Sequence, residues 1–301
     1  MNKNLLHFLK IFFAISVIYY LYDKNKISLE FFHNFLNFKQ LFFSIFFFML
    51  FYLLSIFRWF YILKKIDKRI KFIECFKYDS SSIIFNFLLP IGEISGEIYR
   101  GHLLIKEKNF DKKKAISSIV IDRGSGALSL ILLSILFLPF LFYVKYDSKL
   151  IFLIYILIIL FLFNLKKFLS FLITKISLKL INYNLNLFKK TILPCILISI
   201  LSFCFYFISM VFLSKNLLVE YDILYKSILI FPLGLLINAI PISPGGIGVG
   251  SLGFILLSNY FFLENYIFLE NGILALQIFF LLLGMLLFLI FSLIKDKKNI
   301  K

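Results

Sequence analysis

The sequence predicts an all-α integral membrane protein. Three observations predict it: an apolar composition, apolar stretches long enough to cross a bilayer, and basic residues concentrated between them. Of the 301 residues, 61% are hydrophobic and 16% are charged, whereas soluble domains carry about 45–50% apolar and about 25% charged residues. The composition excludes an ordinary soluble domain, and we therefore expect a multi-pass protein of the cell membrane.

Apolar stretches recur along the chain at lengths that suit membrane crossings. A transmembrane helix needs about 20 mostly apolar residues. Six stretches reach or approach this length: 5–22, 40–63, 115–144, 150–165, 191–214 and 272–293. We expect about six transmembrane helices in a single membrane domain, residues 1–301, without an appended soluble domain.

Lysine and arginine residues orient these spans, because short cytoplasmic loops carry an excess of both. Of the 33, 24 lie within the first ten residues or in segments 64–77, 100–114, 166–190 and 295–301, and the other connections hold seven. We expect the first group, and with it both chain termini, on the cytoplasmic side. The net charge of +17 follows the same loops, which favours contact with anionic lipid headgroups over nucleic-acid binding.

Two further segments, 78–99 and 223–263, do not fit as simple crossings, because each begins and ends on one side of the membrane. Proline and glycine interrupt them at Pro90-Ile-Gly92 and at Pro241-Ile-Ser-Pro-Gly-Gly-Ile-Gly-Val-Gly250. Such residues bend or end a helix, and irregular backbone is tolerated at membrane depth only where protein buries it or water reaches it. We predict two re-entrant hairpins that enter from opposite sides, with the functional site where they meet.

Charged residues of the first hairpin are spaced to share one helix face. Glu93, Glu97 and Arg100 are four and three residues apart, which places them on one side of a helix. One interpretation is a network of ion pairs at the cytoplasmic edge of the membrane. The other is a polar wall that lines a headgroup cavity, since carboxylates at membrane depth are costly unless they are paired or hydrated.

Three more charged residues lie inside predicted spans. Asp122 and Arg123 are neighbours that point in different directions, so we expect each to find its own partner on a hairpin. The Gly124-Ser125-Gly126 segment that follows allows close helix packing. A purely structural role for this pair is the alternative. Arg58 lies six residues before Lys64, and we expect its side chain to extend to the membrane interface.

The glycine-rich break in the second hairpin offers backbone amides rather than charged side chains. Ser243, Gly245, Gly246 and Gly248 belong to a segment that matches neither a Walker phosphate loop nor a dinucleotide fingerprint. A helix that starts after Gly250 would direct its positive end at this place, which suits a lipid phosphate or carboxylate. The sequence contains no catalytic constellation and no metal-ligand spacing, and we expect no cofactor.

The segments that contain these residues resemble three motifs of one membrane-protein family. They are Asn86-Phe-Leu-Leu-Pro-Ile-Gly-Glu-Ile-Ser-Gly-Glu-Ile-Tyr-Arg100, Ile121-Asp-Arg-Gly124 and the proline–glycine break at 241–250. In order, they resemble the LPG-x-x-GGD-x-x-R, DR-x-x-G and P-x-S-x-GG-x-GV-x-E motifs of the flippase-like, lysylphosphatidylglycerol synthase transmembrane-region family.

The sequence departs from the family pattern at three positions. Glu97 stands where the family more often has Asp, Ser251 stands where Glu is usual, and Gln277 is at about the place where a basic residue often follows. A role that depends on the Glu at the end of the third motif, where this chain has Ser251, is therefore not carried over to this chain.

The resemblance implies a membrane domain that translocates aminoacylated phospholipid between leaflets. In the best-known relatives this domain is joined to a soluble aminoacyltransferase domain, which we do not expect here. We therefore predict a lipid flippase or translocator that is not an enzyme, with membrane lipids as partners. We expect Arg100 and Arg123 to contact phosphate or carboxylate, and Glu93, Glu97 and Asp122 to balance cationic headgroups or hold the arginines.

Two alternatives stay open at this point. The chain could be a scaffold or subunit of a lipid-modifying synthase or glycosyltransferase. It could also be an enzyme of the lysylphosphatidylglycerol synthase type, or one acting on a polyprenyl-lipid or glycolipid through Glu93, Glu97 and Asp122 as acid–base or metal-binding carboxylates.

Overall fold

The computed structural model describes residues 38–88, 93–145, 185–214, 221–240, 249–261 and 267–299. Throughout these ranges the regular structure is α-helical, as the composition and apolar spans predict. The helices are α3 (Phe38–Ile66), α4 (Phe72–Leu88), α5 (Glu93–Lys108), α6 (Lys112–Lys145), α8 (Leu185–Ser214), α9 (Tyr221–Asn238), α10 (Val249–Tyr260) and α11 (Ile267–Asn299).

In the described part of the chain, four helices are long and apolar enough to cross a membrane. Helices α3, α6, α8 and α11 contain apolar stretches of 28, 31, 24 and 20 residues. They coincide with four of the predicted spans, 40–63, 115–144, 191–214 and 272–293. The other two predicted spans, 5–22 and 150–165, lie outside the described residues.

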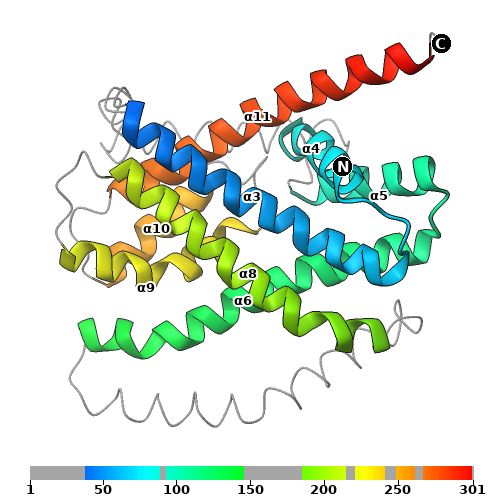
Figure 1. Ribbon diagram of the computed structural model, residues 1–301. Coiled ribbons are helices and arrows are strands. Elements are labelled where there is room, and N and C mark those ends of the chain that lie inside the picture. Colours follow the sequence, from blue (N-terminus) through cyan, green and yellow to red (C-terminus); the bar gives the residue numbers. More distant parts are fainter. Residues whose placement is uncertain are drawn as a thin grey trace, which may run out of the picture.

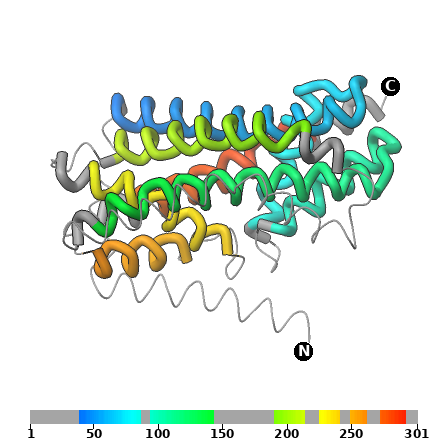
Figure 2. The backbone as a smooth tube through the Cα atoms, turned by 90° about the horizontal axis from the view of Figure 1, so that it is seen from below, coloured from blue at the N-terminus to red at the C-terminus, as the bar shows by residue number. Residues whose placement is uncertain are grey.

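The long helices enclose a core that is rich in aromatic side chains. Helices α3 and α8 run side by side (Figures 1 and 2), α6 packs against α8 and α9, and α11 packs against α4 and α10. Between them, the rings of Phe51 and Tyr206 stack with centroids 4.8 Å apart, and the rings of Phe48 and Phe280 meet edge to face at 5.7 Å. Such aromatic pairs add about 0.5–1.5 kcal/mol each beyond the area that they bury.

Each segment predicted as a re-entrant hairpin contains parts of two helices that pack against each other, and re-entry into a membrane stays a prediction. The first helix pair consists of α4 and α5, and it extends beyond the predicted range 78–99 at both ends. The second helix pair consists of α9 and α10, within the predicted range 223–263 except for its first two residues. The connecting segments 89–92 and 241–248 lie outside the described residues. Entry of the two pairs from opposite sides of a membrane stays a prediction.

Each pair is packed closely because a glycine faces an asparagine. A Cβ added to Gly96 of α5 would overlap the side-chain oxygen of Asn86 in α4, and a Cβ added to Gly250 of α10 would overlap that of Asn238 in α9. Small residues of this kind let two helix backbones approach each other in membrane proteins. The same residue types therefore make the contact in both helix pairs.

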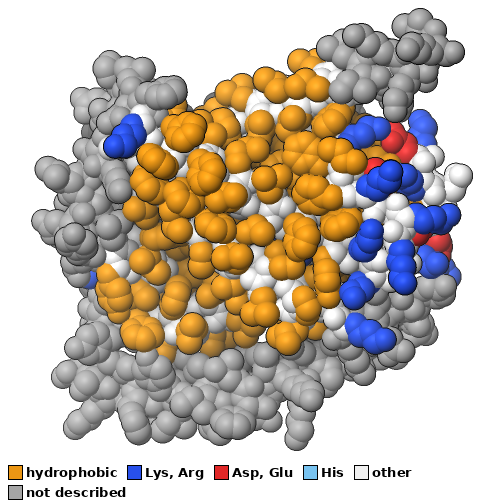
Figure 3. Space-filling model, viewed as in Figure 1, with side chains coloured by type: hydrophobic (Ala, Val, Ile, Leu, Met, Phe, Trp, Pro, Cys, Tyr) orange, Lys and Arg blue, Asp and Glu red, His pale blue; other side chains and the backbone are white. Residues whose placement is uncertain are grey.

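Basic side chains gather at one end of the molecule. Figure 3 shows an apolar middle and a cluster of Lys and Arg at the end where α3 finishes and α6 begins. Lys64 and Lys65 belong to the last turn of α3, and Lys112 and Lys113 begin α6. Segments 64–77 and 100–114 thus share one end, as their charge predicts. The compartment that this end faces, and the position of the chain termini, stay predictions.

Candidate functional site

A cluster of six charged side chains lies where the first helix pair meets α3 and α6. Its three cations and three anions balance formally, and ion pairs link them into one network. We call this network the charged cluster; its members are Arg58 of α3, Asp79 of α4, Glu97 and Arg100 of α5, and Asp122 and Arg123 of α6. Buried charges are costly unless paired, so the pairing explains how the helices accommodate them.

Asp122 is at the centre of the charged cluster and is only 1% exposed. Arg58 Nε donates a hydrogen bond to its Oδ1 and Arg100 Nη2 donates to its Oδ2, each with a donor–acceptor distance of 2.7 Å. Arg58 Nη1 also donates to Ser199 Oγ at 2.8 Å. The prediction that Arg58 extends to the membrane interface is therefore wrong. Its guanidinium turns inward because the buried Asp122 carboxylate needs a second positively charged donor.

Arg100 joins three helices from a fully enclosed position. Its Nη1 lies 2.8 Å from Asp79 Oδ1, and it pairs with Asp122 of α6 and with Glu97, three residues earlier on its own helix. Its guanidinium carbon lies 4.4 Å from the ring centroid of Trp59, which is a cation–π arrangement. Glu97 and Arg100 thus share one face of α5, as their spacing predicts.

Arg123 occupies the open edge of the charged cluster. Its Nε donates a hydrogen bond to Glu97 Oε1 at 2.8 Å, while its side chain is 45% exposed. Asp122 pairs with Arg100 and Arg123 with Glu97, so the two neighbours on α6 do find separate partners on the first helix pair. Glu93 is the first residue of α5, but its side chain lies outside the described residues.

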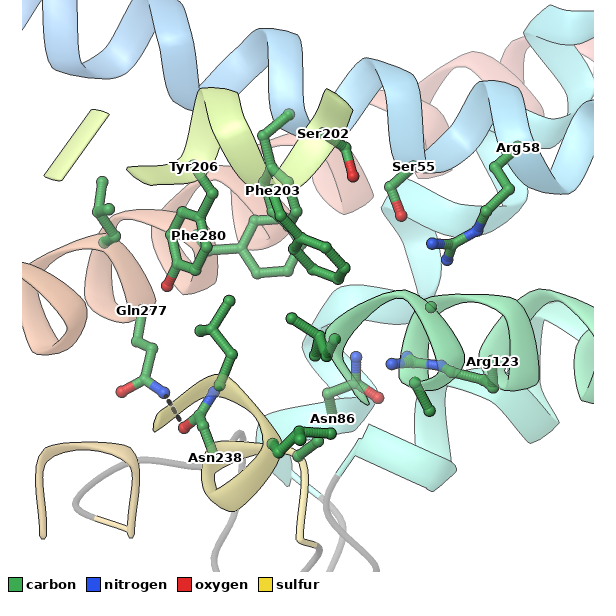
Figure 4. A pocket seen from close by; sticks show the side chains of 18 of the residues that line it. Ser55, Arg58, Asn86, Arg123, Ser202, Phe203, Tyr206, Asn238, Gln277 and Phe280 are labelled. Carbon is green, nitrogen blue, oxygen red and sulfur yellow. Dashed lines mark hydrogen bonds between the residues drawn. The ribbon is translucent and has the colours of Figure 1, made fainter. Parts of the chain in front are cut away.

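A cavity of about 430 Å³ lies between the two helix pairs, against the charged cluster (Figure 4). One part of its wall is polar and consists of Ser55, Arg58, Asn86, Glu97, Arg123, Ser202, Asn238 and Gln277. Another part is aromatic and consists of Phe48, Phe51, Phe203, Tyr206 and Phe280. The cavity is thus amphipathic, with charged groups on one side and phenylalanine rings on another.

The second helix pair reaches the cavity with neutral side chains. Asn238, the last residue of α9, accepts a hydrogen bond on Oδ1 from Gln277 Nε2 of α11 at 3.0 Å. Helix α10 begins at Val249, close to the predicted start after Gly250, and Ser251 is buried within it. The predicted site residues Ser243, Gly245, Gly246 and Gly248 lie outside the described residues.

Sequence reasoning missed several residues of this site. Asp79 carries a charge inside a predicted hairpin, and the cost of such a charge was a signal that could have identified it. Asn86 and Asn238 are neutral, so only their position just before a proline–glycine break marks them. The functional role of the predicted residues, Glu97, Asp122 and Arg123 among them, stays a prediction.

Two of the three carboxylates predicted for an enzyme, Glu97 and Asp122, are already bound by arginines, and the side chain of the third, Glu93, is not among those that the structure describes. Asp122 pairs with Arg58 and Arg100, and Glu97 with Arg100 and Arg123. Among the residues that the structure describes, no group of three or more His, Cys, Asp or Glu side chains is arranged to hold a metal ion.

Comparison with known proteins places the chain in a family. The family model described as lysylphosphatidylglycerol synthase TM region matches residues 8–261, a range that includes the charged cluster and both helix pairs. No match was found among curated proteins or solved structures. Because the match covers most of the chain, the chain belongs to the lysylphosphatidylglycerol synthase transmembrane-region family and is a multi-pass membrane protein related to lipid synthesis or translocation.

Proposed function

We propose that this protein translocates phospholipids or glycolipids between the leaflets of a membrane, with the lipid headgroup bound in the cavity between the two helix pairs. The amphipathic cavity is the observation that carries this proposal. Its volume of about 430 Å³ falls within the range of about 300–1,000 Å³ found for small-molecule sites, and it lies among helices long enough to cross a bilayer.

The polar part of the wall would lower the main barrier to lipid movement. Transfer of a polar group from water to an apolar medium costs about 2–7 kcal/mol if it makes no hydrogen bond, and transfer of an ion costs far more. Arg58, Asn86 and Arg123 on the wall replace water as partners of a headgroup. The aromatic part of the wall suits the glycerol backbone and the first methylene groups of the acyl chains.

The members of the charged cluster take two different roles in this proposal. Arg123, which is half exposed at the cavity, contacts a phosphate or carboxylate of the headgroup, and Glu97 balances and orients it. Arg100 and Asp122 are buried behind the wall, and they hold Glu97 and Arg58 in position. This assignment moves Arg100 from a ligand contact to a positioning residue.

We also propose that the chain performs no chemistry on the lipid. The pairing of Glu97 and Asp122 with arginines supports this, because the oxygens of both carboxylates are already engaged by guanidinium groups rather than directed at a substrate. Lipids recovered after transport should have unchanged mass. A lipid with an added or removed group would support the enzyme alternative instead.

Reconstitution of the full chain into vesicles tests the translocation. The vesicles contain lipids with a fluorescent label on the acyl chain. A membrane-impermeant reductant bleaches the label in the outer leaflet, and further loss of fluorescence measures the movement of lipid from the inner leaflet. We expect faster movement than in protein-free vesicles, and a rate lowered about tenfold or more in Arg123→Ala, since a hydrogen bond to a charged group contributes about 1.5–3 kcal/mol.

Arg69→Ala is the matched control for the loss of an arginine. The Arg69 side chain is 88% exposed and pairs with Asp67 in the connection between α3 and α4, away from the cavity. The rate of lipid movement in Arg69→Ala should equal that of the wild type. Equal rates in Arg123→Ala and Arg69→Ala, or no movement above protein-free vesicles for any phospholipid or glycolipid, would contradict the proposal.

A further inference from the structure

Asn86 and Asn238 occupy matching positions in the two helix pairs. Each lies at the end of the first helix of its pair, and its side-chain oxygen faces a glycine of the second helix, Gly96 or Gly250. Gly96 N donates a hydrogen bond to Asn86 Oδ1 at 2.8 Å, and Gln277 Nε2 donates to Asn238 Oδ1 at 3.0 Å. In both pairs the amide oxygen is therefore bound by the protein itself.

The amide nitrogens of both residues are left to face the cavity. Both side chains line it (Figure 4), one from each helix pair. An asparagine amide has two N–H donors, and the hydrogen bonds that Asn86 and Asn238 make with other described residues use their Oδ1 atoms. Donors without an acceptor are costly at membrane depth, so the cavity presents four N–H groups suited to an acceptor-rich ligand.

The charge of the wall indicates which acceptor is suitable. Among the described residues that line the cavity, Arg58 and Arg123 are the cations and Glu97 is the carboxylate, and Glu97 is already paired with Arg123 and Arg100. The wall therefore favours an anion over a cation. A phosphodiester has two non-bridging oxygens that share one negative charge, and each can accept hydrogen bonds from a separate amide.

We propose that Asn86 and Asn238 are ligand-binding residues that donate hydrogen bonds to one phosphodiester group, one from each helix pair. This inference rests on the proposed translocation of a lipid through the same cavity. Because each asparagine also contacts the glycine of its own pair, a lipid phosphate bound between them links the packing of the first helix pair to that of the second. The ligand thereby joins the first helix pair to the second.

Aspartate substitution removes the donors and keeps the acceptors. In Asn86→Asp and Asn238→Asp, Oδ1 still accepts from Gly96 N–H or from the Gln277 amide, but an anionic oxygen replaces the nitrogen. The control is Asn109→Asp, an exposed position between α5 and α6 with the same change in charge; its φ of 50° lies in a region that Asn and Asp both tolerate.

Binding is measured with the purified full chain in detergent, by titration with phosphatidylglycerol that carries a fluorescent acyl chain. We expect each cavity variant to bind about tenfold or more weakly than wild type, and Asn109→Asp to bind like wild type. The effect of the double variant should be smaller than the product of the two single effects, because both amides hold one group. Diacylglycerol with the same chains lacks the phosphate, and its weaker binding should be equal in all five proteins.

Three results would overturn the inference. Unchanged binding of phosphatidylglycerol in either cavity variant would exclude that asparagine as a donor. An equal loss for diacylglycerol would show that the asparagines only support the helix pairs. Displacement of the labelled lipid by soluble glycerol phosphate at comparable concentration would identify a water-soluble phosphate ester as the ligand.

The inference and the proposed function can fail separately. If wild type moves lipids in vesicles and the cavity variants bind phosphatidylglycerol normally, translocation stands and the paired amide contact is wrong. If wild type binds phosphatidylglycerol through both asparagines but moves no lipid, the paired contact stands and the protein is a lipid-binding subunit rather than a translocator.

Discussion

The two helix pairs share an asparagine–glycine contact and both pack through apolar side chains, but buried ion pairs are added to this packing in the first pair. The first pair is joined to α3 and α6 by ion pairs, with Asp122 and Arg100 at their centre. The second is packed through apolar side chains, such as Phe231 of α9, whose ring lies 5.1 Å from that of Phe207. Hydrogen-bonded ion pairs are directional, whereas the hydrophobic effect is not. We therefore expect the first pair to be the fixed wall of the cavity and the second to be the side that can adjust.

The largest loss of stability should come from removing Asp122, the centre of the charged cluster. Asp122→Ala leaves Arg58 buried beside Arg100 without their shared carboxylate, and breaking one partner of a buried pair costs about 3–5 kcal/mol. Unfolding of the purified protein in mixed micelles should reveal this loss. Asp67→Ala is the control, because Asp67 pairs with Arg69 at the surface, where such pairs contribute about 0–1 kcal/mol. Equal losses in the two variants would show that the first helix pair is not anchored by charge.

A smaller loss is expected where the first helix pair is packed most closely. In Gly96→Ala the new Cβ would overlap Asn86 Oδ1 and would lie 2.7 Å from the backbone oxygen of Ser82. Backbone cannot rotate away as a side chain can, so α4 and α5 must separate, and the Gly96–Asn86 hydrogen bond is lost with them. Overpacking of this kind costs about 1–3 kcal/mol.

The same unfolding measurement checks this effect, with the second substitution Asn86→Ala as its control. The double variant Gly96→Ala/Asn86→Ala lacks the asparagine amide. It should not regain stability, because the Ser82 carbonyl oxygen still blocks the new methyl group. Full recovery in the double variant would mean that only the side chain limits the approach of the two helices.

The sequence predicted the parts of the fold that depend on local properties. The length and apolar character of 40–63, 115–144, 191–214 and 272–293 predicted α3, α6, α8 and α11, since a membrane span must satisfy its own backbone and face lipid. The proline and glycine residues at 90–92 and 241–250 marked the places where the first helix of each pair has ended and the second begins. Helix ends were less predictable: α11 continues to Asn299, because the lysines after the apolar span favour helix as well.

The site was predictable only where it depends on spacing along one helix. The interval of three residues between Glu97 and Arg100 predicted their shared face. The partners Arg58 and Asp122 are 64 residues apart in sequence, and their contact depends on how α3 and α6 align, which composition and periodicity do not contain. Asn86 was missed for a related reason, since a neutral amide in an apolar helix gives no charge signal and its contact with Gly96 exists only in the packed pair.

The smallest stability effect, and the sharpest comparison of the two pairs, is expected at Gly250. The three nearest atoms to a Cβ there all belong to the side chain of Asn238, and the end of that side chain can rotate into the cavity. Gly250→Ala should therefore cost less than Gly96→Ala, below about 1 kcal/mol, and Asn238→Ala should relieve it. If the two glycine variants lose equal stability, the second helix pair is held as rigidly as the first. If Gly250→Ala is mild but lowers lipid movement as much as Arg123→Ala does, the adjustable side of the cavity takes part in transport through the position of the Asn238 amide.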